Sequence, residues 1–155
     1  MQMKILFILA VGLYFLFLIA GKRLKSIEIY SGVFSSLYIA LAFDAFFKGK
    51  HKLYYYGSDA GVHYIDFFFR LSLYPLSCLI LLKLVSIPRT RFVQFILIIS
   101  WALIWTMLEW GLLKADVIKY DGWKIYYSTL KYLFIYSLVY FNGQITKKLA
   151  MKKSM

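Results

Sequence analysis

The sequence reads FVQFILIISWALIWTMLEWGL from Phe92 to Leu112, and this apolar run of about 20 residues decides the fold class. A helix rises about 1.5 Å per residue, so the run is long enough to cross a hydrocarbon core of about 30 Å. Its one charged residue is Glu109, which follows Trp101 and Trp105 at intervals of four. The run therefore predicts a membrane span with a carboxyl group on an aromatic face.

Composition extends this prediction to the whole chain. The 155 residues are 62% hydrophobic with a mean hydropathy of +0.68, which is too apolar for an ordinary soluble domain. We predict an all-α, polytopic membrane bundle: a single membrane domain over residues 1–155 with about five transmembrane helices. The predicted spans are about 5–21, 27–47, 64–85, 92–112 and 125–145.

The first run has two interpretations, a retained anchor or a cleaved signal peptide. It ends in a basic stop at Gly21 to Lys25 without a convincing small-x-small cleavage site. This favours the anchor.

Ionisable residues occur inside four of the predicted spans. Each costs roughly 2.5–3.5 kcal/mol on insertion scales, so such groups mark a functional or pairing site. The predicted topology places all of them within roughly 9 Å of the same membrane face. The residues of this charged layer are Asp44, Asp66, Arg70, Glu109 and Lys131.

The charged layer has two interpretations. In the structural one, Asp66 and Arg70 form an i, i+4 pair, and the other charges reach toward the headgroups. In the functional one, the layer is an outward-facing pocket above Tyr74 and the tryptophans of the fourth run, which binds an ion or zwitterion or relays protons. We further expect Glu109 to meet Lys131, because the fourth and fifth helices are consecutive and joined by a short loop. The predicted binding residues are Asp44, Asp66, Arg70, Tyr74, Glu109 and Lys131.

The sequence offers little evidence of catalytic or metal-binding motifs. His51 and His63 lack partners at ligand spacing, and we expect no metal or cofactor. The single Cys78 can form no disulfide within the chain. Glu109 is the one candidate acid, because apolar and aromatic neighbours would favour its protonated form.

Lysines and arginines predict the orientation. Outside the spans, nine are on the side of the C-terminal tail and seven on the other, which favours a cytoplasmic C-terminus and an external N-terminus. The net charge of +12 suits an anionic lipid surface and does not imply nucleic acid. The lipid bilayer is therefore the expected partner. A further helix could pack on a stripe of small residues: Gly32, Ser36 and Ala40.

Several short motifs follow one another in a fixed order from Asp44 onward. They are Tyr54-Tyr55-Tyr56-Gly57, Tyr74-Pro75, Ser100-Trp101 to Glu109-Trp110, Gly122-Trp123-Lys124 and Lys147-Lys148. In this order they resemble a family of small uncharacterised multi-pass membrane proteins from Gram-positive, spore-forming bacteria. The resemblance implies a plasma-membrane protein with about five helices. It implies no reaction, ligand or partner.

Three classes of function stay open. The first is binding or transport of an ion or small polar molecule by the charged layer. The second is a membrane-embedded enzyme that acts on a lipid or isoprenoid, with Glu109 as its acid. The third is a non-catalytic accessory subunit of a larger membrane complex. We rank binding or transport first.

Overall fold

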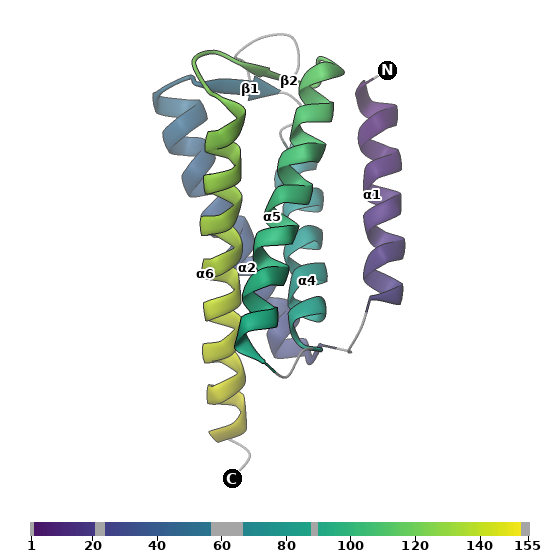
Figure 1. Cartoon of the computed structure of the whole chain (residues 1–155), viewed down its shortest axis with the longest axis vertical. Coiled ribbons are helices and arrows are strands. Elements are labelled where there is room, and N and C mark those ends of the chain that lie inside the picture. The colour runs from purple at the N-terminus through teal and green to yellow at the C-terminus, as the bar shows by residue number, and fades with distance from the viewer. Residues whose placement is uncertain (1, 21–23, 57–66, 88–89, 153–155) are drawn as a thin grey trace.

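The computed structural model describes residues 2–20, 24–56, 67–87 and 90–152, which form an all-α bundle of five packed helices (Figure 1). Two π-helical turns and a two-stranded ribbon complete the described part of the chain. The helices are α1 (Gln2–Ile19), α2 (Ser26–Phe43), α4 (Tyr74–Val85), α5 (Arg91–Lys114) and α6 (Ile125–Lys152). The π-helical turns are η1 (Asp44–Lys50) and η2 (Phe69–Leu73), and the strands are β1 (Tyr54–Tyr56) and β2 (Ile118–Tyr120).

The helices coincide closely with the apolar runs of the sequence. α2 continues through η1 as one helical segment, and η2 continues directly into α4. η2 is a wide turn that lies just before Pro75, the second residue of α4. Proline has no N–H to donate to the preceding turn, which accounts for the wider winding there. α6 runs beyond the predicted end at 145, as far as Lys152.

The ribbon was not expected from the helical prediction. β1 and β2 pair antiparallel, with Tyr54 opposite Tyr120 and Tyr56 opposite Ile118. Backbone N–H and C=O groups in the segments between helices need hydrogen-bond partners, and β1 and β2 supply these partners to each other. The ribbon joins the end of η1 to the loop between α5 and α6, so it ties together two helix connections that are far apart in the sequence.

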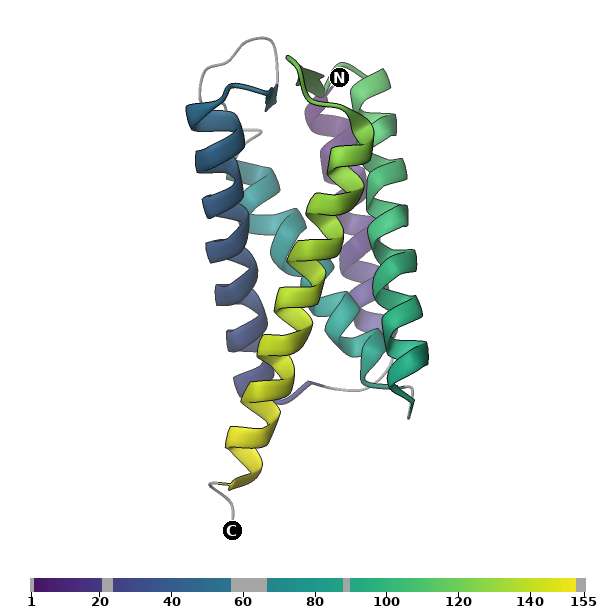
Figure 2. The same cartoon turned by 60° about the vertical axis from the view of Figure 1, so that its left-hand side comes forward.

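α4 lies at the centre of the bundle. Ten of its residues are buried, on every side of the helix, as expected for a helix that is apolar all round. Figure 2 shows α6 in front between α2 and α5, with α4 behind them. α1 packs on the outside, against α4 and η2. The ends of the bundle differ: the ribbon and the N-terminus lie at one end, and the C-terminus lies at the other (Figure 1).

The stripe of small residues on α2 packs inside the chain. Gly32, Ser36 and Ala40 are all buried. A Cβ atom on Gly32 would lie 2.8 Å from Cδ1 of Leu82 and 3.1 Å from Cδ2 of Leu79, both on α4. The small-residue stripe that was predicted to pack on a partner helix therefore packs on α4. Its small side chains allow α2 and α4 to approach closely.

Two helical segments in the described residues are long and apolar enough to cross a membrane, Ser26–Lys50 and α5. α1 is apolar but shorter over the stretch Lys4–Ile19. The core helix of a soluble protein, or a signal sequence near an N-terminus, has the same length and composition. The packing thus shows a helical bundle, and the length and composition of its helices fit both a membrane protein and a soluble core.

Candidate functional site

Charged residues of the predicted layer gather at the ribbon end and form two ion pairs. Arg70 Nε lies 2.8 Å from Asp44 Oδ2, and Lys131 Nζ lies 3.3 Å from Glu109 Oε2. The structure therefore confirms that Glu109 meets Lys131. Asp66 lies outside the described residues, so its predicted pairing with Arg70 stays a prediction. Asp44, Glu109 and Lys131 are at most 4% exposed, and none of them reaches outward as the structural interpretation expected.

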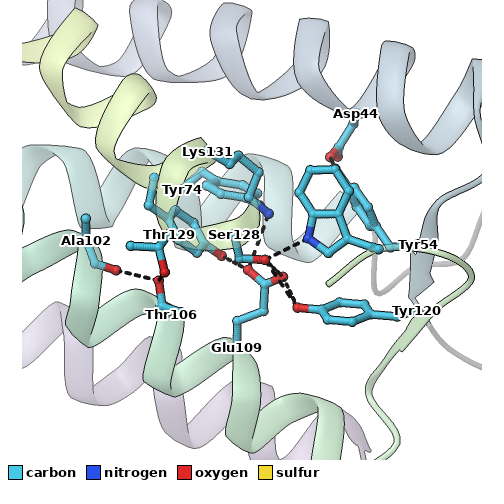
Figure 3. Close-up of polar contacts among 12 residues, drawn as sticks. Asp44, Tyr54, Tyr74, Ala102, Thr106, Glu109, Tyr120, Ser128, Thr129 and Lys131 are labelled. Carbon is cyan, nitrogen blue, oxygen red and sulfur yellow. Dashed lines mark hydrogen bonds and ion pairs between the residues drawn. The ribbon is translucent and has the colours of Figure 1, made fainter. Parts of the chain in front are cut away.

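Glu109 is the centre of the larger cluster (Figure 3). Its Oε1 accepts hydrogen bonds from Tyr120 at 2.6 Å and from Ser128 at 2.7 Å. Its Oε2 accepts from Lys131 at 3.3 Å and from Tyr132 at 2.5 Å. Four donors on two oxygens match the acceptor capacity of an ionised carboxylate. Since a proton on Glu109 would compete with these donors, the geometry does not favour Glu109 as a proton donor.

α6 supplies three of these donors from one helical face. Ser128, Lys131 and Tyr132 follow the i, i+3, i+4 spacing, which places them side by side in the first two turns of the helix. α5 and α6 are antiparallel neighbours, so this face meets Glu109 near the last turns of α5. The spacing around Lys131 is the sequence signal that could have identified Ser128 and Tyr132.

Aromatic rings enclose the ammonium group of Lys131. Its Nζ lies 4.6 Å from the ring centre of Tyr132, 5.1 Å from that of Tyr54 and 5.8 Å from that of Trp123. These are cation–π distances. Trp123 also donates from its indole nitrogen to Ser128 at 2.8 Å. The buried cation is therefore stabilised by one carboxylate and three ring faces.

The ribbon connects the two ion pairs. Tyr54 and Tyr120 are directly paired, and such residues project from the same face of a ribbon. Tyr54 donates to Asp44 at 2.5 Å, whereas Tyr120 donates to Glu109. Burial raises the pKa of both tyrosines above their ordinary value near 10, so both hydroxyls remain protonated donors. The ribbon thus donates one hydrogen bond to each of the two carboxylates.

The residues expected beneath the charged layer differ in burial: Tyr74, Trp101 and Trp105 are buried, whereas Trp110 is 54% exposed. The Tyr74 hydroxyl is 3.4 Å from that of Tyr56, and both side chains are buried. Trp105 packs against Tyr132 at 6.1 Å between ring centres, and its buried indole nitrogen has no hydrogen-bond partner within the described ranges. Trp101 lies deeper and donates to Ser77 at 3.1 Å.

Metal ligands do not cluster in the described part of the chain, where no three His, Cys, Asp or Glu side chains come together. His51 packs edge-on against Phe46 with ring centres 4.7 Å apart. His63 lies outside the described residues. Cys78 is buried in α4.

Two openings flank η1 at the ribbon end. One, of about 550 Å³, lies between η1, the β2–α6 turn and α6. Lys131 is its charged residue, and aromatic and aliphatic side chains form the rest: Phe43, Phe47, Leu53, Trp123, Tyr127, Leu130 and Phe134, together with Gly122. We call it the Lys131 groove. The other opening, of about 360 Å³, has four charged residues in its lining, which consists of Leu41, Asp44, Ala45, Lys48, Gly49, Lys52 and Arg70.

Comparison of the chain with protein-family models, with curated proteins and with solved structures finds no match.

Proposed function

We propose that the protein is an integral membrane protein whose five helices all cross the bilayer. The support comes from the distribution of polarity. Large apolar side chains cover the outside, such as Phe34 (67% exposed), Met107 (73%) and Phe141 (62%), whereas Glu109 and Lys131 are buried. In the two long apolar segments, Ser26–Lys50 and α5, only 22% and 28% of an 18-residue apolar stretch is buried. The core helix of a soluble protein would be mostly buried. In a bilayer, these apolar side chains would contact lipid tails instead of water.

We place the protein in a bacterial plasma membrane with its C-terminus in the cytoplasm. The location rests on the family resemblance of the sequence, and the orientation rests on the lysine and arginine distribution. The ribbon, the Lys131 groove and the two ion pairs then face the outside.

For its activity we propose binding of an amphipathic molecule in the Lys131 groove. The single observation that carries this is a groove of about 550 Å³ with apolar and aromatic walls and one charged residue, Lys131. The volume is within the range of small-ligand sites. Lys131 Nζ can donate three hydrogen bonds, and Glu109 accepts one of them. An apolar chain would fill the groove while an oxygen atom of its head accepts from Lys131.

The charge of the site indicates what kind of head it accepts. Glu109 neutralises Lys131, and Asp44 neutralises Arg70, so a charged ligand would bring a net charge into a buried layer. An uncharged, oxygen-bearing head avoids that cost. We therefore propose a ligand such as a long-chain alcohol, in preference to an ion.

A photoreactive long-chain alcohol tests this proposal. The protein in phosphatidylcholine nanodiscs is labelled with a diazirine-bearing hexadecanol, and the labelled peptides are mapped. We expect label on residues 122–134 and competition by unlabelled hexadecanol. Leu130→Trp, which fills the groove, should reduce the label several-fold. Leu138→Trp on the same helix, outside the groove, is the matched control.

Two results would overturn the proposal. One is uniform labelling of the lipid-facing helices, because the groove would then bind no better than the surrounding surface. The other is equal competition by hexadecane, because Lys131 would then contribute nothing to recognition.

A second candidate is binding of a small polar molecule in the opening beside Asp44 and Arg70. The observation in its favour is that four charged side chains line an opening of about 360 Å³: Asp44, Lys48, Lys52 and Arg70. A thermal-shift screen with zwitterionic amino acids would test it. A stabilising amino acid whose effect disappears in Lys52→Gln but persists in Lys119→Gln would support this candidate, and the absence of any shift would reject it.

A further inference from the structure

A second charged groove lies at the other end of the bundle, between α5 and α6. It has a volume of about 470 Å³ and combines two cations with an apolar wall. Arg91 begins α5, and Phe95 and Ile98 follow at the spacing of one helical face. This face leads from the cation at the end of the bundle toward its middle.

α6 contributes the other wall, which also ends in a cation. Phe141, Gln144 and Lys148 share one helical face, and Lys148 lies nearest the C-terminus. Because α5 and α6 are antiparallel, Arg91 and Lys148 come to the same end of the groove. Figures 1 and 2 show the start of α5 and the end of α6 at the end of the bundle away from the ribbon. The groove thus has two cations at its mouth, the apolar side chains Phe95, Ile98 and Phe141 along its walls, and the polar side chains Ser137, Tyr140 and Gln144 between them.

Arg91 and Lys148 have no carboxylate partner among the described residues. The described carboxylate at this end of the bundle is Glu28, which already binds Lys147 at 3.2 Å and the backbone N–H of Lys25 at 2.8 Å. Two uncompensated cations at one mouth favour an anion there.

The helix at the groove mouth adds to this preference. α5 begins at Arg91, and its N-cap residue Thr90 makes no side-chain hydrogen bond to the helix. Thr90 thus supplies no side-chain acceptor at this end of α5, where the two cations also lie, and the helix dipole favours negative charge there. Tyr140, which lines the groove, donates a hydrogen bond to Gln94 at 2.5 Å.

We propose that this groove binds one anionic phospholipid, with its phosphate between Arg91 and Lys148 and an acyl chain along Phe95, Ile98 and Phe141. The inference rests on the proposed membrane location, but it does not depend on the ligand of the Lys131 groove. Basic pockets between helices at the cytoplasmic face are suited to anionic headgroups. The proposed orientation places this groove at that face.

Native mass spectrometry of the detergent-purified full chain tests the proposal, with phosphatidylglycerol and phosphatidylcholine as the probes. We expect the first phosphatidylglycerol to bind at least tenfold more tightly than phosphatidylcholine. Each cation should contribute about fivefold, so Arg91→Gln with Lys148→Gln should weaken phosphatidylglycerol binding about 25-fold. Lys25→Gln with Lys152→Gln removes the same charge outside the groove, and it should change binding less than threefold.

Three results would overturn the proposal. Equal loss in the two double variants would show diffuse attraction by the net charge, and equal binding of the two lipids would show no headgroup recognition. Glycerol 1-phosphate, the water-soluble headgroup, should not compete at concentrations that saturate with lipid; full competition would assign the site to free phosphates. Release of the protein from membranes by alkaline carbonate would instead refute the membrane location itself, so the two failures are distinguishable.

Discussion

The ion pair between Glu109 and Lys131 makes a quantitative prediction about stability. Both side chains are at most 4% exposed, so removing one partner leaves a buried charge without its counter-charge. Such a removal costs about 3–5 kcal/mol. Lys131→Met should lie near the lower end, about 3 kcal/mol, because Tyr120, Ser128 and Tyr132 still donate to Glu109. At about 2–4 °C per kcal/mol for a chain of 155 residues, its melting temperature should fall by about 6–12 °C.

Glu109→Gln should cost more than Lys131→Met. Glu109 is the hydrogen-bond acceptor of Lys131 in the described part of the chain, and the surrounding rings cannot replace a carboxylate. We expect a loss of about 4–5 kcal/mol. The double variant carries no unpaired charge, so it should be more stable than either single variant, with a coupling energy of at least about 2 kcal/mol.

Thermal unfolding of the four proteins in one detergent measures this cycle. Lys124→Met, which removes an exposed lysine from the loop before α6, is the control and should change the melting temperature by less than about 2 °C. Strictly additive losses in the double variant would refute the reasoning, because the two residues would then not share an interaction.

Three further predictions concern orientation, packing and pH. In a cysteine-free background, an impermeant thiol reagent should label Asp121→Cys and not Lys152→Cys on intact cells; the reverse pattern would invert the proposed topology. Gly32→Val should destabilise the bundle by about 1–3 kcal/mol because α4 leaves no room there, whereas Gly12→Val, with nothing within 4 Å, should be tolerated; equal melting temperatures would contradict this packing. Burial raises the folded-state pKa of Tyr120. The stability that its protonated hydroxyl contributes is therefore fully present below about pH 10 and is lost as the pH rises through the raised pKa. The melting temperature should therefore fall above pH 10, and less in Tyr120→Phe; identical slopes would exclude this origin.

The positions of the helices could be predicted from the sequence alone. Apolar runs near 20 residues, separated by glycines and charges, locate the helices, because each run reflects a local balance of length and hydrophobicity, but they do not give every end: α6 extends seven residues past its apolar run. The pairing of Glu109 with Lys131 was also predictable. It follows from a short connection between consecutive antiparallel helices, which constrains both residues to neighbouring surfaces at the same end of the bundle.

Only the tertiary structure decided which groups surround each charge. Tyr54 and Tyr120 reach Asp44 and Glu109 because two connections distant in the sequence pair as a ribbon, and no local pattern encodes that pairing. The pairing of Asp44 with Arg70 likewise depends on which helices become neighbours. Similarly, the small-residue face of α2 around Gly32 could pack on a partner helix or on a helix of the same chain, and in the structure it packs on α4. Helical periodicity defines the face of one helix, whereas the neighbour of that face depends on the packing of all the helices together.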